Sequence, residues 1–472
     1  MLFNSLDFIV FFPIVALIYY LLRNHNRLNN LWLLIASYYF YMNLKPAYAL
    51  ILIASTLITY FCGRLLETYH EDTKLKKVAL AVCLVLNFSI LFIFKYYNFI
   101  NGSVESLLSS AGIRWDVPYL DVLLPVGISF FTFQSAGYII DVYRKTVPAE
   151  RNFLTYALFV SFFPVILAGP IQRAKNLIPQ LKAQHPILYD NVITGLRMML
   201  WGYFMKLCVA DRLGTYVDSV FDYIPQHNGV SLAIASVFYS IQIYGDFAGY
   251  SLVALGCARI MGFRLPDNFL RPYFSTTIKE FWKRWHIGLS SWFGDYLYIP
   301  LGGNRVKYWH YLLNLMIVFL VSGLWHGAAW TFVFWGALHG LYQIIEAVKR
   351  KLAGGVSTTN SMPRFISIMI VFLLVSLAWI FFRAETIQDG FTIVTKILTQ
   401  PGAPFIQAMP MLLGCLSLAI LFAKDFADEF HPSWKMLNAD NQVVSVLTTA
   451  VLITYILLFG VLDSSQFIYF QF

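Results

Sequence analysis

Long apolar runs, separated by short polar segments, recur along almost the whole chain. A helix needs about 20 residues to cross a hydrocarbon core of about 30 Å, because each helical residue advances it by about 1.5 Å. Runs near this length, several of them short or interrupted, lie near residues 6–22, 31–44, 47–66, 78–98, 154–171, 191–209, 230–257, 311–345, 365–382, 409–423 and 444–462. The pattern predicts an all-α polytopic membrane protein with about ten to thirteen transmembrane or re-entrant helices.

Two stretches of the hydrophobic pattern are interrupted or too long for one simple crossing. Residues 121–140 carry a proline and two glycines within an apolar sequence, so a broken or re-entrant helix is as well supported there as a clean span. The run 311–338 would measure about 42 Å as a single helix, which is too long for one perpendicular crossing. We therefore expect it to tilt or to break near Gly323 and Gly327, which would set His326 near mid-membrane.

Composition and charge agree with a membrane location and suggest an orientation. Hydrophobic residues make up 58% of the 472 positions and charged residues only 12%, and the net charge is +9. Residues 1–8 contain no Lys or Arg, whereas RNHNR follows the first run, so the positive-inside rule predicts an extracytoplasmic N-terminus. We expect one membrane-embedded domain over residues 1–472, with a flexible cytoplasmic loop at about 349–364.

Several classes of function lack sequence support. The chain has no P-loop, no GxGxxG dinucleotide motif and no basic, aromatic-interleaved soluble domain for nucleic acid. Its five cysteines are scattered without zinc-binding spacing. We therefore predict no bound metal, no tightly bound cofactor and no nucleic-acid partner.

A cationic stripe occurs in residues 276–305, TTIKEFWKRWHIGLSSWFGDYLYIPLGGNR. Lys279, Lys283 and His286 follow one another at helical spacing, while aromatic and aliphatic residues recur on the other side. The spacing predicts one amphipathic, interfacial or re-entrant helix, and the turn that follows leaves Arg305 able to reach an anion. The alternative is a helix that only rests on lipid phosphates.

Two histidines lie in the apolar sequence SGLWHGAAWTFVFWGALHG, residues 322–340. Ionisable rings at that depth predict either a functional site or core histidines that donate to backbone carbonyls. On a single helix His326 and His339 would lie about 20 Å apart and on different faces, so they could not bind one metal. Gln242 and Asp246 share a face of another apolar run, where Asp246 either faces a substrate or pairs with a buried cation.

The motifs FWKRWHIGLSSWFGDYLYIPLGGNR and LWHGAAWTFVFWGALHG together resemble the membrane-bound O-acyltransferase (MBOAT) family, in particular its bacterial polysaccharide branch of the alginate O-acetylation type. The similarity extends to LLPVGISFFTFQSAGYIIDVYR, FFPVILAGPIQR, QIYGDFAGYSLVALGCARIMGF and the terminal FIYFQF. The resemblance implies an MBOAT-like ring of helices around a central tunnel. It also implies that His326 is the essential histidine of the family and His286 a second motif histidine.

Acyl transfer to a hydroxyl needs a base, and we expect neutral His326 to supply it, with His286 positioning a substrate. The cations Lys279, Lys283 and Arg305 would then hold the phosphates of an acyl donor, acetyl-CoA or another acyl thioester. The residues expected to line the tunnel are Trp325, Trp330, Gln242 and Asp246.

The sequence thus predicts an O-acyltransferase that moves an acyl group, acetyl by the resemblance, from a cytoplasmic thioester across a bacterial inner membrane. The acceptor would be an extracytoplasmic polysaccharide such as alginate, reached indirectly through a secreted or membrane-anchored acetyltransferase of the SGNH type. Three alternatives stay open at this point. They are D-alanyl transfer to teichoic acid from a carrier protein, a polysaccharide transporter or flippase, and a non-catalytic scaffold.

Overall fold

The computed structural model describes residues 1–68, 73–121, 124–354, 363–431, 433 and 441–461. These residues form helices and contain no strand. Eight helical stretches among them are long and apolar enough to cross a membrane: Tyr48–Thr68, Lys74–Ser110, Tyr189–Phe221, Gly229–Ile260, Tyr308–His326, Arg364–Arg383, Ala408–Phe430 and Gln442–Phe459. Two shorter apolar helices are Leu6–Leu21 and Phe153–Ile166. The protein is an all-α polytopic membrane protein, as predicted, although its exact number of crossings stays a prediction.

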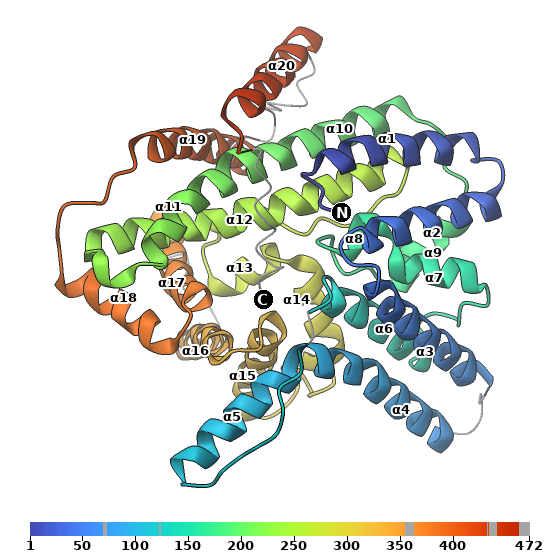
Figure 1. The fold of residues 1–472 in the computed structure, drawn as a ribbon, viewed down its shortest axis with the longest axis horizontal. Helices are drawn as coiled ribbons and strands as arrows, with labels where there is room; N and C mark the ends of the chain where they lie inside the picture. The colour runs from blue at the N-terminus through green and yellow to red at the C-terminus, as the bar shows by residue number, and fades with distance from the viewer. Residues whose placement is uncertain (69–72, 122–123, 355–362, 432, 434–440, 462–472) are drawn as a thin grey trace. The chain divides into compact units, whose positions relative to one another are not determined.

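The backbone, whose helices are labelled in Figure 1, groups by its internal contacts into two compact units. The first comprises residues 1–194 and 257–265, and the second comprises 195–256 and 266–472. The single membrane domain expected from the sequence stays a prediction. Of the predicted loop at 349–364, residues 349–352 are instead the last turn of a helix, and 355–362 lie outside the described residues. The terminal FIYFQF motif also lies outside them.

The first unit contains the N-terminal helices, several of which follow the predicted apolar runs. They are α1 (Leu6–Leu21), α2 (Asn26–Met42), α3 (Tyr48–Thr68), α4 (Thr73–Leu91), α5 (Tyr97–Ser110), α6 (Ile128–Tyr143), α7 (Phe153–Ser161), α8 (Phe163–Ile166) and α9 (Ala174–Lys182). Between α4 and α5 the helix continues through a π-helical turn, η1 (Phe92–Tyr96). In the described part of 121–140, helix α6 begins only after Gly127, which takes a φ of 77°, and no break interrupts it from there to residue 140.

The second unit contains the predicted site residues. Its helices are α10 (Tyr189–Tyr203, begun in the first unit), α11 (Asp211–Phe221), α12 (Gly229–Ile260), α13 (Ile278–Arg284), α14 (Ile287–Phe293), α15 (Tyr308–His326), α16 (Trp330–Leu352), α17 (Arg364–Arg383), α18 (Ile387–Thr399), α19 (Ala408–Phe430) and α20 (Gln442–Phe459). Two π-helical turns, η2 (Phe204–Ala210) and η5 (Gly294–Tyr298), interrupt or extend them. The core of the unit is rich in aromatic side chains, including the fully buried Trp285, Trp335 and Trp379.

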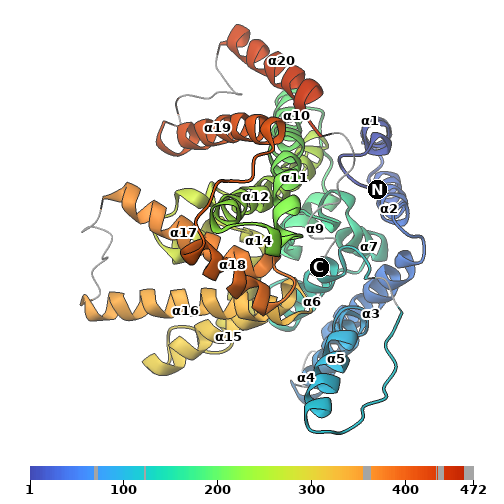
Figure 2. The ribbon, with the colours of Figure 1, turned by 60° about the vertical axis from the view of Figure 1, so that its left-hand side comes forward.

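Helices α15 and α16 form a hairpin and lie along each other, with α17 and α18 beside α16 (Figure 2). The long apolar run therefore breaks where the sequence predicted. Glycines let the two helices approach, because a Cβ added at Gly323 would lie 2.2 Å from the backbone oxygen of Phe332. At Gly327 the added Cβ would lie 2.0 Å from the Phe332 ring, so only glycine fits this reversal.

The cationic segment differs from the prediction. Instead of one amphipathic helix, it forms two short helices, because α13 ends at Arg284 and α14 begins at Ile287. His286 lies at the break in the left-handed conformation, with φ 43° and ψ 55°. A periodic pattern of side chains could not reveal this break, which contacts from another part of the chain hold in place.

Candidate active site

A cavity of about 580 Å³ opens between α13, α14, the turn η5 and the α15–α16 hairpin. All of its walls belong to the second unit. Its volume lies within the range typical of small-molecule and cofactor sites. The residues that line it are Lys279, Trp282, Lys283, Ile287, Leu289, Ser290, Ser291, Phe293, Gly294, Tyr298, Asn304, Tyr311, Leu315, Val318, Phe319, Ser322, Gln343 and Arg350.

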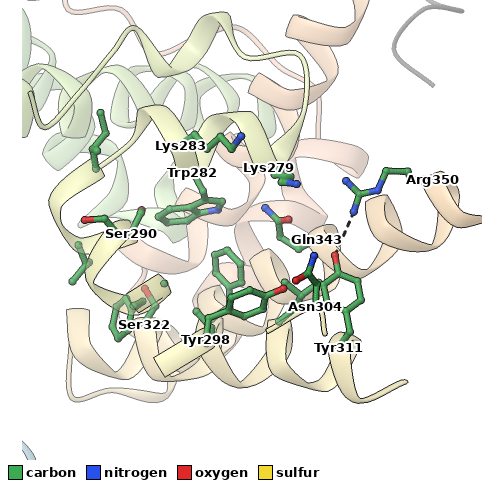
Figure 3. Close-up of a pocket in the computed structure, with 18 residues that line it drawn as sticks. Lys279, Trp282, Lys283, Ser290, Tyr298, Asn304, Tyr311, Ser322, Gln343 and Arg350 are labelled. Atoms are coloured by element: carbon green, nitrogen blue, oxygen red, sulfur yellow. Dashed lines mark hydrogen bonds between the residues drawn. The ribbon is translucent and has the colours of Figure 1, made fainter. Parts of the chain in front are cut away.

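The cavity has chemically different ends (Figure 3). At one end Lys279 and Arg350 approach each other, and Arg350 donates a hydrogen bond from Nη2 to the hydroxyl of Tyr311 at 3.3 Å. At the other end lie the hydroxyl groups of Ser290 and Ser322, with an apolar and aromatic wall between the two ends. This arrangement suits an elongated ligand that is anionic at one end and less polar at the other.

Glu346 of α16 fixes the start of α13 and with it the position of Lys279. The carboxylate accepts hydrogen bonds from the backbone nitrogens of Ile278, at 3.2 Å, and of Lys279, at 3.0 Å. Thr277 caps the same helix by accepting from the nitrogen of Glu280 at 3.0 Å. A carboxylate at a helix N-terminus also meets the positive end of the helix dipole. The helix is therefore anchored on α16, the helix that carries Arg350.

Two neighbouring cations, Lys283 and Arg350, affect the ammonium group of Lys279. Partial burial, together with the positive charges of Arg350 and Lys283, lowers the pKa of the Lys279 ammonium, while Glu346 opposes this shift. Cations held close together lose repulsion when an anion binds between them. The mouth of the cavity is therefore suited to phosphate groups.

His326 is the last residue of α15 and is buried, with 2% of its surface exposed. Its ring centroid lies 4.9 Å from that of Trp325, 5.0 Å from that of Trp335 and 5.5 Å from that of Phe382. Ser322, at the hydroxyl end of the cavity, precedes His326 by one turn of α15. Trp282 in the cavity wall contacts Trp335 at 5.7 Å, so an aromatic path connects the cavity to the histidine.

His286 and His326 both lie beside Trp325, although 39 residues separate them in the sequence. His286 is fully buried, and its ring centroid lies 5.9 Å from that of Trp325 and 4.7 Å from that of Phe247, to which it is nearly perpendicular. Burial lowers the pKa of the His286 imidazole below its usual value, so the ring is neutral at physiological pH. The structure thus brings both predicted histidines into contact with the same indole, that of Trp325.

His339 lies closer to His326 than the single-helix geometry predicted. Because the run reverses between α15 and α16, the rings of His326 and His339 both contact Trp335, at 5.0 Å and 4.9 Å. Nδ1 of His339 accepts a hydrogen bond from Nε1 of Trp282 at 3.2 Å. Nδ1 of His339 is therefore bonded to an indole of the cavity wall. The alternative considered from the sequence was a bond to a backbone carbonyl.

Asp246 belongs to a buried ion cluster. The Lys206 ammonium, on the π-helical turn η2, lies 2.6 Å from Oδ1 of Asp246 and 2.8 Å from Oδ1 of Asp211. Of the two alternatives left open by the sequence, this geometry supports pairing with a buried cation. Gln242 packs at a helix contact, since a Cβ added at Gly214 would lie 2.8 Å from its Nε2.

Comparison with known proteins identifies the family. The model of the MBOAT, membrane-bound O-acyltransferase family, matches residues 144–387. This range contains α12 to α17 and both buried motif histidines. The chain belongs to the membrane-bound O-acyltransferase family. It is therefore an acyltransferase, and the family resemblance of its sequence motifs is confirmed.

Several relatives of this MBOAT protein carry more specific names. The chain is 35% identical to a probable alginate O-acetylase, AlgI, of Pseudomonas putida, over an alignment that covers 100% of both chains. It is also 35% identical to a peptidoglycan O-acetyltransferase of Helicobacter pylori, over 85% of this chain and 80% of the relative. A teichoic acid D-alanyltransferase of Bacillus subtilis is 30% identical over a shorter part, 55% of this chain and 69% of the relative.

Besides Asp246 and Gln242, two further residues of the predicted MBOAT site lie outside the cavity lining. Arg305 is exposed in the turn after η5 and lies outside the cavity lining, where Arg350 supplies the third cation. Trp330 is 57% exposed, and Trp335, 0% exposed, takes the place beside His326 that was expected for it. Arg350 was visible in the sequence as part of a KRK run, but that run was attributed to a cytoplasmic loop.

Proposed function

We propose that this membrane-bound O-acyltransferase takes an acetyl group from a cytoplasmic thioester, acetyl-CoA or a related acyl donor, for the O-acetylation of an extracytoplasmic polysaccharide. One observation carries the proposal. A cavity with cations at its mouth reaches Ser322, which lies one helical turn before the buried His326. The relatives named as alginate and peptidoglycan O-acetylating proteins support the choice of polymer chemistry.

The donor would lie along the cavity with its phosphates at Lys279, Lys283 and Arg350. These side chains donate charge-assisted hydrogen bonds, which suit phosphate oxygens. The thioester end would then reach the hydroxyls of Ser290 and Ser322, which can donate to the carbonyl oxygen as negative charge develops on it. The aromatic wall excludes water, and so protects the thioester from hydrolysis.

His326 would act as the general base. In its neutral form it accepts the proton of the acceptor hydroxyl while the hydroxyl oxygen forms a bond to the acyl carbon. The carbon–sulfur bond then breaks, and the proton leaves with the thiolate as a thiol. His286, which contacts Trp325 as His326 does, would hold the donor or the acceptor in place. Because His326 is buried, its ring must become accessible when substrates bind.

The polysaccharide itself would not enter this site. A cavity of about 580 Å³ accommodates a small acyl donor but not an extended polymer. We propose that the acyl group leaves on the extracytoplasmic side to a secreted or membrane-anchored acetyltransferase of the SGNH type, which delivers it to the polymer. The proposal includes a bacterial inner membrane with the N-terminus outside, which the distribution of Lys and Arg between the loops supports.

The test is reconstitution of the purified protein in liposomes with radiolabelled acetyl-CoA on the cytoplasmic side and polysaccharide on the other. We expect transfer to the polysaccharide only when the partner acetyltransferase is added, and a loss of about 10²–10⁴-fold in rate for His326→Gln. The His326→Gln protein should insert and purify normally.

Two results would overturn parts of the proposal. Transfer within a few fold of wild type by His326→Gln would exclude the histidine as the base, and polymer acetylation without a partner would exclude the relay. A protein that accepts only D-alanyl groups from a carrier protein would instead be a D-alanyltransferase, like the Bacillus subtilis relative.

A further inference from the structure

Asn268, which precedes His286 by 18 positions, makes three hydrogen-bond contacts to the break between α13 and α14. His286 at the break takes a left-handed conformation, which is uncommon for a residue with a side chain and costs about 1 kcal/mol or more. The backbone oxygen of Asn268 accepts from the nitrogen of Ile287 at 2.9 Å. Its side-chain Oδ1 accepts from the nitrogen of Gly288 at 3.3 Å and lies 3.2 Å from Nδ1 of His286.

These contacts determine which nitrogen of His286 carries the proton. The nitrogen of Gly288 is a backbone donor, so the atom of Asn268 that faces it must be the amide oxygen. An amide oxygen only accepts hydrogen bonds. Nδ1 of His286, which meets the same oxygen, must therefore be the protonated nitrogen. In a neutral imidazole the lone pair is then on Nε2.

The surrounding side chains also fix the orientation of the His286 ring. His286 is 0% exposed and Asn268 is 1% exposed. The ring centroid of His286 lies 4.7 Å from that of Phe247, in an edge-to-face arrangement, and 6.4 Å from that of Phe269, next to Asn268 in the chain, in a stacked one. Rotation of the ring would lose the hydrogen bond and displace buried aromatic side chains, which are costly changes in a packed core.

We infer that Asn268 is a positioning residue for the acyl transfer: by accepting from Nδ1 of His286 it presents the basic Nε2 to the reacting groups. This inference rests on the proposed function, in which His286 assists at the site. It assigns to His286 one tautomer and one orientation, in the way that a hydrogen-bond acceptor orients a catalytic or metal-binding histidine in other proteins.

The other end of the Asn268 amide provides a control. Nδ2 is buried and has no hydrogen-bond partner among the described residues, and Asn268 is one of the residues that line a second cavity of about 210 Å³. Ser251 lines the same cavity, and its hydroxyl likewise lacks a partner within the described part of the chain. Ser251→Ala therefore alters this second cavity without removing the contact to His286.

Four variants separate the two ends of Asn268. Asn268→Ala removes both contacts, and we expect it to lower kcat about 100-fold with the KM for the acyl donor unchanged. Asn268→Asp keeps an oxygen for Nδ1 and for Gly288 but loses the Nδ2 donor, so it should recover activity to within about tenfold of wild type. Ser251→Ala should match wild type, and the double variant Asn268→Ala/His286→Ala should be no worse than His286→Ala alone.

Two variants of His286 distinguish its nitrogens. His286→Asn keeps a donor near the position of Nδ1 and tolerates the left-handed conformation, whereas His286→Gln keeps a polar group near the position of Nε2. We expect His286→Asn to fold with wild-type thermal stability and to lose activity. Nitrogen-15 NMR of histidine-labelled protein should show the Nδ1–H tautomer at His286 in the wild type, and a mixture of tautomers in Asn268→Ala.

Each outcome bears on the inference. Additive losses in the double variant, or an Nε2–H tautomer in the wild type, would overturn the positioning role. Equal losses in Asn268→Asp, Asn268→Ala and Ser251→Ala would also overturn it, because they would make the second cavity the functional feature. Full activity of His286→Ala would instead remove His286 from the proposed function, while the NMR result would still decide whether Asn268 sets the tautomer.

Discussion

Nε1 of Trp282 donates a hydrogen bond to Nδ1 of His339 at 3.2 Å, so a fully buried histidine fixes one wall of the cavity. The indole of Trp282 also lies 5.3 Å from Phe319, another lining residue, and 5.7 Å from Trp335 beside His326. The orientation of this indole therefore affects both the shape of the cavity and the packing around the proposed base.

His339→Ala should raise the KM for the acyl donor and lower stability, because it leaves the Trp282 donor without a partner and opens a void. The expected loss of stability is about 2–4 kcal/mol. His339→Asn is the matched control, since its amide oxygen can accept from Trp282 near the position of Nδ1. Thermal unfolding in detergent and donor KM measure the two effects. A complete loss of kcat in both variants would contradict this structural role and indicate that His339 takes part in the chemistry.

Charge at the mouth of the cavity should control donor affinity. The double variant Lys283→Gln/Arg350→Gln should raise the donor KM about tenfold or more and make it less sensitive to salt. The control Lys283→Gln/Arg305→Gln removes the same charge but leaves Arg350 in the lining, so its KM should rise clearly less. Equal effects of the two double variants would show that only the total charge matters, and a loss of kcat at unchanged KM would place Arg350 outside the donor site.

Donor binding should weaken as pH rises, and should do so at lower pH than for an ordinary lysine. Burial and the neighbouring cations Arg350 and Lys283 lower the pKa of Lys279, while Glu346 opposes the shift. The ammonium of the free enzyme therefore loses its proton earlier, and an anionic donor must restore it on binding. Donor KM measured against pH should rise on the alkaline side in the wild type. Lys279→Arg, which stays charged, should flatten this rise, and an unchanged profile would contradict the assignment.

The buried ion cluster should contribute to stability and not to chemistry. Lys206→Met leaves the carboxylates of Asp211 and Asp246 buried without their shared cation, which should cost about 3–5 kcal/mol. Asp246→Asn should be milder, because Lys206 keeps Asp211. Thermal unfolding in detergent measures both. A variant with wild-type stability and a large loss of kcat would instead support the tunnel-lining role expected for Asp246 from the sequence.

Local features of the chain were predicted well from the sequence. Apolar runs of about 20 residues predict membrane helices because unpaired backbone groups are costly in lipid, and most of the observed helices follow these runs. The break near Gly327 was also predictable, since the run is too long for one crossing and carries glycines at that point. The motifs around His286 and His326 were specific enough to indicate the family.

Contacts between distant segments were decided only by the tertiary structure. Arg350 and not Arg305 joins Lys279, because the α15–α16 hairpin brings the end of α16 back to α13, and sequence periodicity carries no information about that reversal. Trp335 replaces Trp330 beside His326 because it shares a helix face with His339, one turn later, and that face turns inward.

The backbone conformation at His286 is the clearest example of a local structure that tertiary contacts determine. Helical spacing of Lys279, Lys283 and His286 predicted one continuous helix, since each of these residues accepts helical geometry by itself. Three hydrogen bonds to Asn268 instead stabilise a left-handed residue and two short helices. Local propensity differs between such conformations by only about 1 kcal/mol, so a few buried contacts from another segment determine the outcome.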